Sequence, residues 1–215
     1  MYIPEHFRVR HNEDAIAFLR ANPFAILISS TENGPFATHL PLFVDAQDEK
    51  LLLRGHVARA NPHWRYLEAG PQCLAIFHGP HSYISPTNYS ASDSVPTWNY
   101  AAVHVYGEAR LFTSEADLRG MLNDLIHTFE PSYNEQWENA TPSFRENMLR
   151  QIVGFEITAT RIEGKFKLSQ NRTRDDQARV IASIEESTDS TVSGVAEMMK
   201  QQGLGLQHAE REEKK

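Results

Sequence analysis

One short turn gathers several side chains that could bind an anion. The segment Leu53–His63 (LRGHVARANPH) places Arg54 and His56 at the end of an apolar run, and Arg59 just before Asn61, which a proline follows. Asn-Pro is a typical start of a helix. Cations beside the free amides of a helix N-terminus suit a phosphate group. A solvated turn without a ligand is equally compatible with this spacing.

Four aromatic residues stand in a second segment, His78–Tyr100, together with three prolines. We expect a long loop here, and loops of this length are usually either functional or disordered. Rigid aromatic rings favour a functional loop, in which they stack on a planar ligand or pack across a subunit interface. A loop that only covers its own core is the alternative. The four residues are Tyr83, Tyr89, Trp98 and Tyr100.

A third segment is the most basic part of the chain. Arg161–Arg174 (RIEGKFKLSQNRTR) carries five cations and one acid. Lys165 and Lys167 flank a phenylalanine, so in an extended chain both side chains point to the same side. They could hold a phosphate group or a nucleic-acid backbone, or they could form a solvated edge.

Other chemistry is not favoured by the pattern. The ten histidines do not show the H-E-x-x-H spacing of a zinc site, and no metal site is predicted. Cys73 lies in an apolar run, where a buried and unreactive thiol is expected. Neither a nucleophile elbow nor a phosphate-binding glycine loop occurs. Catalytic residues stay unassigned, and the question of enzyme activity stays open.

Composition restricts the class of protein that positions these residues. The 215 residues are 40% hydrophobic, which is typical of a globular protein. A net charge of −7 argues against global attraction to nucleic acid. The chain lacks a stretch of about 18 apolar residues that would span a membrane and does not start with a signal peptide pattern. With a single cysteine as well, we expect a cytoplasmic protein without membrane association.

Strands and helices alternate irregularly along the chain. Short β-branched or aromatic runs bounded by turns predict six strands: Ala25–Ser30, Phe36–Val44, Lys50–Arg54, Gln72–His78, Val103–Phe112 and Ile152–Ile162. Capping residues predict helices that begin at Asn12, Asn61, Ser114 and Thr141. Amphipathic patterns predict two more helices, Asp175–Ile184 and Val192–Gln202.

This order predicts a mainly β fold with peripheral helices (α+β), built on a closed or partly closed antiparallel barrel. We expect the barrel domain, with its inserted helices, to span residues 1–172. Residues 173–202 would form a C-terminal helical appendage, and residues 203–215 a flexible tail.

Five motifs, in this order, resemble the PaiB family: MYIPEHF, RGHVARANP, HGPHSYISP, VPTWNYAAVHVYG and KFKLSQNR. Its members are described as FMN-binding negative transcriptional regulators linked to protease synthesis and sporulation. The resemblance implies a split β-barrel of the FMN-binding, pyridoxamine-phosphate-oxidase-like type. It also implies a homodimer with FMN in a cleft between the subunits.

The resemblance assigns candidate residues to the cofactor site. The strand around Thr38, His39 and Leu40 would border the isoalloxazine ring. The turn with the anion-binding pattern would hold the phosphate, and the late basic run would close the site. The full set of cofactor-binding candidates is Thr38, His39, Leu40, Arg54, His56, Arg59, Asn61, Trp98 and Lys167.

Three functions remain open from the sequence. The first is a flavin-dependent transcriptional regulator or sensor whose partner is DNA or another regulator. The second is a flavin oxidoreductase or a haem-binding, haem-degrading enzyme on the same fold, and the third is a cofactor-free scaffold. From Arg174 to Lys215 there are 6 Lys/Arg against 9 Asp/Glu, a net of −3. Because this charge repels DNA, we expect Lys167 to serve the cofactor and intrinsic DNA affinity to be weak.

Overall fold

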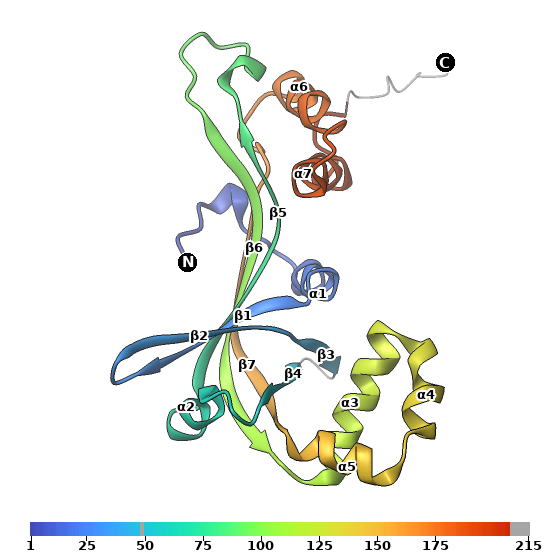
Figure 1. Cartoon of the computed structure of the whole chain (residues 1–215). Coiled ribbons are helices and arrows are strands. Elements are labelled where there is room, and N and C mark those ends of the chain that lie inside the picture. The colour runs from blue at the N-terminus through green and yellow to red at the C-terminus, as the bar shows by residue number, and fades with distance from the viewer. Residues whose placement is uncertain (48–49, 207–215) are drawn as a thin grey trace, which may run out of the picture. The chain divides into compact units, whose positions relative to one another are not determined.

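The computed structural model describes residues 1–47 and 50–206 (Figure 1). Within these residues, one seven-stranded sheet has the order β2-β1-β5-β6-β7-β4-β3. The pairs β1/β2, β1/β5, β3/β4 and β4/β7 are antiparallel. The strands are β1 Phe24–Thr31, β2 Gly34–Pro41, β3 Phe43–Gln47, β4 Lys50–Ala58, β5 Gln72–Ile84, β6 Thr97–Phe112 and β7 Ile152–Lys167.

Helices occupy the connections between strands and the C-terminal part. The α-helices are α1 Asn12–Ala21, α2 His63–Ala69, α3 Glu115–Phe129, α4 Asn134–Asn139, α5 Pro142–Arg150, α6 Arg174–Ile184 and α7 Ser190–Gln201. Short 3₁₀ turns lie at Glu5–Phe7, Pro86–Asn88 and Pro131–Tyr133. Two of the predicted caps are confirmed, since Ser114 and Thr141 each accept a hydrogen bond from an amide of the first turn. The other two are wrong, because Asn12 is already the first residue of α1 and α2 begins only at His63, after Pro62. Helix α4 was not predicted from the sequence.

The chain forms two compact units. We call His11–Phe77 with Val103–Glu163 the barrel unit. We call Met1–Arg10 with His78–Ala102 and the chain from Gly164 onward the hairpin unit. Strands β5, β6 and β7 contribute residues to both units.

The barrel unit closes partly on itself because glycines allow its strands to approach closely. β2 lies against β4 although the sheet order separates them. A Cβ at Gly55 of β4 would lie 2.9 Å from Leu42 Cδ2, and one at Gly107 of β6 would lie 2.5 Å from Ile157 Cγ2. At Gly107 the carbonyl oxygen of Thr158 would also lie 2.5 Å away, so a side chain there would force β6 and β7 apart, and at Gly55 the Leu42 side chain would have to shift. The predicted partly closed barrel is therefore confirmed.

Alternating side chains fill the core of the barrel unit. Val103 and Val105 are buried, and their neighbours on the opposite face of β6 are partly exposed, as predicted. The apolar stripe of α3 packs through Leu118 and Met121 onto Leu149 of α5. Phe129, predicted as part of this stripe, is instead 50% exposed because α3 ends there.

Several predicted boundaries are wrong. The strands predicted at Lys50–Arg54, Val103–Phe112 and Ile152–Ile162 are longer in the structure, as the bounds of β4, β6 and β7 show. The segment Phe36–Val44 forms two strands, β2 and β3, which are separated at Leu42. The Leu42 amide donates to Pro23 O at 2.9 Å, outside the strand pairing on either side. His78–Tyr100 is mostly a hairpin, because β5 continues to Ile84 and β6 begins at Thr97. β5 runs through Gly79-Pro80 without a break, and Ser82 and Ile84 beyond this pair are buried on one face of the strand. The connecting loop spans only residues 85–96.

The hairpin unit contains the two predicted C-terminal helices. α6 and α7 pack on each other, and their apolar residues Val180, Ile184, Val195 and Met199 are buried. Of the expected tail 203–215, residues 207–215 lie outside the described residues. Among the helices that the structure describes, none is long and apolar enough to cross a membrane.

Candidate functional site

Thr38 on the edge strand β2 is the centre of a polar network in the barrel unit. Its Oγ1 accepts a hydrogen bond from Asn61 Nδ2 at 3.2 Å and lies 2.7 Å from His63 Nδ1. The other ring nitrogen, His63 Nε2, lies 3.1 Å from Ser29 Oγ. Asn61 also accepts a hydrogen bond from the His63 amide at 3.0 Å. The network thus fixes the turn before α2 to β2 and β1.

His63 is fully buried, with 0% of its surface exposed. Burial lowers the pKa of its imidazole from 6.5 to about 4, so the ring is neutral at physiological pH. The Phe36 ring meets it edge to face, with centroids 5.2 Å apart. No pattern in the sequence marks His63, apart from its place at the end of the turn that carries the anion-binding residues.

The turn that contains Arg59 is hydrogen-bonded to the junction between α5 and β7. The Arg59 amide donates to Gln151 O at 2.7 Å. Its guanidinium donates to Arg150 O at 2.8 Å through Nε and to Ile152 O at 3.0 Å through Nη2. The side chain is nevertheless exposed. Arg59 is therefore a fixed cation at the surface, two residues from Asn61.

Arg54 is in a different environment. Its guanidinium forms ion pairs with Asp45, with Asp124 at 2.9 Å and with Glu156 at 3.9 Å. The structure does not bring Arg54 and Arg59 to one pocket: Arg54 lines a hollow with Asp124 and Glu156, and Arg59 lines another with residues of α3 and α5. The carboxylates around Arg54 neutralise its charge.

The remaining candidates of the barrel unit differ in exposure. His56 is partly buried, which lowers the pKa of its imidazole, and its Nδ1 has no hydrogen-bond partner among the described residues. His39 is exposed on β2, and its ring is stacked near Phe24 with centroids 6.4 Å apart. Leu40 belongs to the core, with 5% of its surface exposed.

Trp98 and Lys167 belong to the hairpin unit. Trp98 is 53% exposed and meets Tyr83 edge to face, with centroids 6.1 Å apart. Both rings line a hollow of about 420 Å³ with His81 and the apolar side chains of Ile184 and Val192. Tyr89, by contrast, is buried under the guanidinium of Arg172. Of the predicted aromatic segment, Tyr89 is therefore buried, whereas Tyr83 and Trp98 are exposed.

The two lysines of the basic run lie in β7, as expected for an extended segment. The Lys167 ammonium donates to Thr97 Oγ1 and, at 2.7 Å, to Trp98 O. Partial burial, followed by the charges of Lys165 and Arg172, lowers the pKa of Lys167. Lys165 is buried, and its ammonium donates to Tyr2 O at 3.3 Å.

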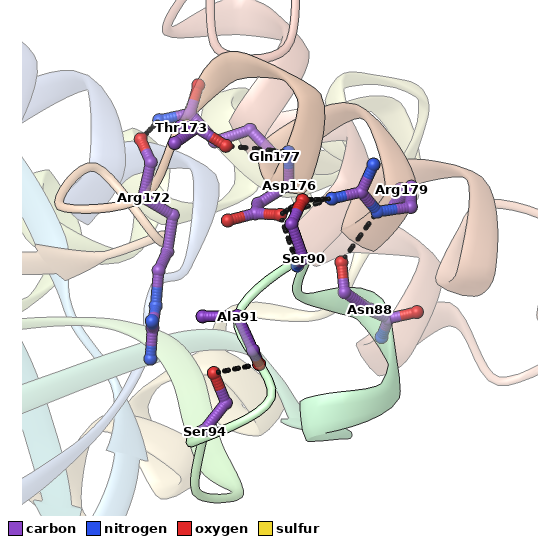
Figure 2. A network of polar contacts seen from close by, with 9 residues as sticks. All are labelled: Asn88, Ser90, Ala91, Ser94, Arg172, Thr173, Asp176, Gln177 and Arg179. Carbon is purple, nitrogen blue, oxygen red and sulfur yellow. Dashed lines mark hydrogen bonds and ion pairs between the residues drawn. The ribbon is translucent and has the colours of Figure 1, made fainter.

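A second polar network in the hairpin unit joins the loop after β5 to α6 (Figure 2). Asp176 accepts hydrogen bonds from the amide and the hydroxyl of Ser90, both at 2.9 Å, and pairs with Arg179. Arg179 also donates to Asn88 O at 2.9 Å. In the sequence, the pattern Thr173-x-x-Asp176 indicates a helix cap, which the structure contains. No other sequence pattern indicates the contacts with Ser90 and Asn88.

The only cysteine of the sequence, Cys73, is buried in β5, and its thiol donates to Gly107 O at 3.6 Å. Burial raises the pKa of the thiol from 9.0 to about 12. The prediction of an unreactive thiol agrees with this environment. Within residues 1–47 and 50–206, no group of three or more His, Cys, Asp or Glu side chains could hold a metal ion.

Comparison with known proteins identifies relatives of the chain. Residues 1–161 match the family model described as "Putative FMN-binding domain". The chain is 37% identical to "Protease synthase and sporulation protein PAI 2" of Bacillus subtilis over 201 residues, which cover 93% of this chain and 96% of the relative.

Two solved structures share the fold. The FAD and Heme binding protein from Mycobacterium smegmatis matches with a TM-score of 0.58 and 15% identity, covering 74% of this chain and 73% of that one. The Flavocytochrome Anf3 from Azotobacter vinelandii matches with a TM-score of 0.57 and 18% identity, covering 77% and 72%. These matches confirm the predicted fold class.

Proposed function

This chain belongs to the FMN-binding family that includes protein PAI 2 of Bacillus subtilis, and we propose that it is a homodimeric, flavin-dependent regulator or sensor of the PaiB type. The family prediction and the FMN prediction from the sequence are both confirmed. FMN supplies one- and two-electron redox chemistry when bound. The placement of FMN, the dimer and the regulatory role are our proposals.

One observation supports a specific FMN position. Asn61 hydrogen-bonds to Thr38 and belongs to the same turn as Arg59. The turn that carries the exposed Arg59 is therefore hydrogen-bonded to the edge strand β2. We propose that the isoalloxazine ring lies along β2 around Thr38 and His39. The ribityl phosphate would then bind Arg59, whose remaining N–H donors suit a phosphate.

Arg54 is not favoured as the phosphate ligand. Its guanidinium already has Asp45, Asp124 and Glu156 as partners. A phosphate dianion placed there would be repelled by the carboxylates. We therefore assign Arg54 to the stability of the barrel unit and Arg59 to the cofactor.

A sensor is favoured over a direct repressor by the distribution of charge. From Arg174 to Gln201, the span of α6 and α7, there are 3 Lys/Arg against 6 Asp/Glu, a net of −3. The Lys167 ammonium is already bonded to Thr97 and Trp98. The negative charge of these helices would repel the phosphate backbone of DNA, so DNA binding would be weak.

Exposed aromatic side chains support the dimer. Phe24 is 59% exposed beside the edge strand β2, and Tyr83 and Trp98 are 51% and 53% exposed in the hairpin unit. Aromatic residues are enriched in protein interfaces, and an unpaired sheet edge needs cover. Sedimentation should therefore give a dimer at micromolar concentration, and a stable monomer would contradict the proposal.

The absorption spectrum of the purified protein, before and after FMN or haemin is added, tests the cofactor. A flavin spectrum with saturable FMN binding is expected, and binding of haemin in place of FMN would favour the haem-binding alternative. Rapid NAD(P)H oxidation by the FMN-loaded protein alone would favour an oxidoreductase.

The sensor is tested with a Lys167→Ala variant, which is assayed by FMN titration and by DNA binding at several salt concentrations. We expect little DNA binding with or without the substitution. Unchanged FMN affinity with loss of a salt-dependent DNA complex would favour a direct repressor.

A further inference from the structure

The hydroxyl oxygen of Thr38 has two neighbours in the protein that can donate hydrogen bonds to it. Asn61 Nδ2 is one donor, at 3.2 Å. The orientation of the Asn61 amide is fixed, because its Oδ1 accepts the His63 N–H at 3.0 Å. The second neighbour is His63 Nδ1 at 2.7 Å, and whether this nitrogen carries the proton decides the direction of that hydrogen bond.

Ser29 decides which nitrogen of His63 carries the proton. Ser29 is 1% exposed and His63 is 0% exposed, so water does not reach their contact. The Ser29 hydroxyl has His63 Nε2 as its only hydrogen-bond partner among the described residues. A buried hydroxyl proton without an acceptor is unfavourable. Ser29 therefore donates to Nε2, and the neutral ring carries its proton on Nδ1.

This tautomer directs the Thr38 proton away from the network. His63 Nδ1–H and Asn61 Nδ2–H both donate to Thr38 Oγ1 and occupy its lone pairs. The hydroxyl proton of Thr38 then has no acceptor within residues 1–47 and 50–206. Thr38 is partly exposed on the edge strand β2, so a ligand can reach it.

We infer that the Thr38 hydroxyl is a directed hydrogen-bond donor to the isoalloxazine ring of FMN, and that Ser29 and His63 are positioning residues that set its direction. This inference rests on the proposed function. The acceptor would be a carbonyl oxygen or an unprotonated nitrogen of the ring, because the ring offers acceptors of both kinds. Ser29, His63 and Asn61 fix the hydroxyl in advance, so its orientation costs little entropy on binding.

The tautomer is tested on the protein without FMN. Nitrogen-15 NMR of the histidine side chains at pH 7 should show His63 protonated on Nδ1, with assignment from the signals lost in a His63→Gln variant. Protonation on Nε2 would overturn the inference. This measurement does not depend on whether the protein binds FMN.

The contact is tested with FMN labelled with carbon-13 and nitrogen-15 in the ring. Thr38→Val should weaken FMN and riboflavin binding alike, by about tenfold, because the lost hydrogen bond is to the ring. Thr38→Ser keeps the donor and should stay within about twofold of the unmodified protein. In Thr38→Val, at least one signal of C2, C4, N1 or N5 should move toward its value in a ring without that hydrogen bond. In Thr38→Ser these signals should stay in place.

The outcomes separate the two proposals. If the unmodified protein binds FMN but its ring signals coincide with those of Thr38→Val, the Thr38 contact is wrong and FMN binding itself stands. If the unmodified protein binds no FMN, both the proposed function and the Thr38 contact are wrong. Thermal unfolding of each variant controls for folding, and the serine variant retains a testable hydroxyl if Thr38→Val does not fold.

Discussion

Asp176 accepts two hydrogen bonds from Ser90, one from the main-chain amide and one from the hydroxyl, each at 2.9 Å. The two residues are 86 positions apart in the sequence. The carboxylate thereby holds the loop that follows β5 against the first turn of α6. Because the Asp176 side chain is only 7% exposed, these hydrogen bonds are shielded from water.

We predict that Asp176→Asn destabilises the protein at pH 7. The neutral amide loses the charge that strengthens the hydrogen bonds from Ser90 and the ion pair with Arg179. The free energy of unfolding should fall by about 1.5–3 kcal/mol. Urea titration measures this change. Asp175→Asn, which removes the same charge from an exposed residue of the same turn, should change stability by less than about 0.5 kcal/mol.

The pH dependence of this network has a defined sign. Burial would raise the pKa of Asp176, but hydrogen bonds from Ser90, Thr173 and Arg179 outweigh burial and lower it. A carboxyl group with a lowered pKa stabilises the fold above its ordinary pKa, which is near about 4. That stabilisation is lost as the pH falls through the lower value in the fold. The difference in stability between the unmodified protein and Asp176→Asn should therefore shrink below about pH 4.

We predict that Arg59→Gln weakens FMN binding selectively. Loss of a charge-assisted contact to the phosphate corresponds to about 1.5–3 kcal/mol, or roughly ten- to 150-fold in affinity. Riboflavin, which lacks the phosphate, should bind both proteins equally, and fluorescence titration with the two ligands measures the contrast. Arg54→Gln is the control: it should lower the unfolding temperature without changing the ratio of FMN to riboflavin affinity. Equal losses for both ligands in Arg59→Gln would assign this arginine to the fold.

His63 should make stability fall as the pH drops from 6.5 to about 4. Burial lowers its pKa to about 4, so the unfolded chain binds a proton in this window that the folded chain does not. The contribution of His63 to stability therefore rises with pH through this window and is constant above it, with a total effect on the order of 3 kcal/mol. Urea titrations at a series of pH values should show a shallower slope for His63→Gln. His39→Gln, at an exposed position, should keep the slope of the unmodified protein.

Cys73 should not react with thiol reagents in the folded protein at about pH 8. With the pKa of the thiol at about 12, compared with 9.0 ordinarily, the thiolate population is lower by about a thousandfold. Burial in β5 also excludes the reagent. Reaction with a chromogenic disulfide should release one equivalent of thiol in urea and almost none without it. Fast reaction of the folded protein would show that β5 opens around Cys73.

The sequence was sufficient for features that depend on local patterns. The alternation of Val103 and Val105 with polar neighbours reports strand geometry directly, because successive side chains of a strand point to opposite faces. Ser114 and Thr141 identify helix starts because their hydroxyl groups bond amides within the same turn. Motifs that span most of the chain were sufficient to predict the family and its cofactor.

The contacts of each candidate side chain became clear only from the folded chain. The short spacing of Arg54 and Arg59 suggested one anion site, but Arg54 meets the carboxylates of Asp124 and Glu156. Arg59 instead donates to the main-chain carbonyl groups of Arg150, at the end of α5, and Ile152, at the start of β7. Ser29, Thr38 and His63 come from three separate elements and show no common pattern in the sequence. Hydrogen-bond partners of this kind are set by strand register and burial over long sequence distances, and local periodicity does not encode them.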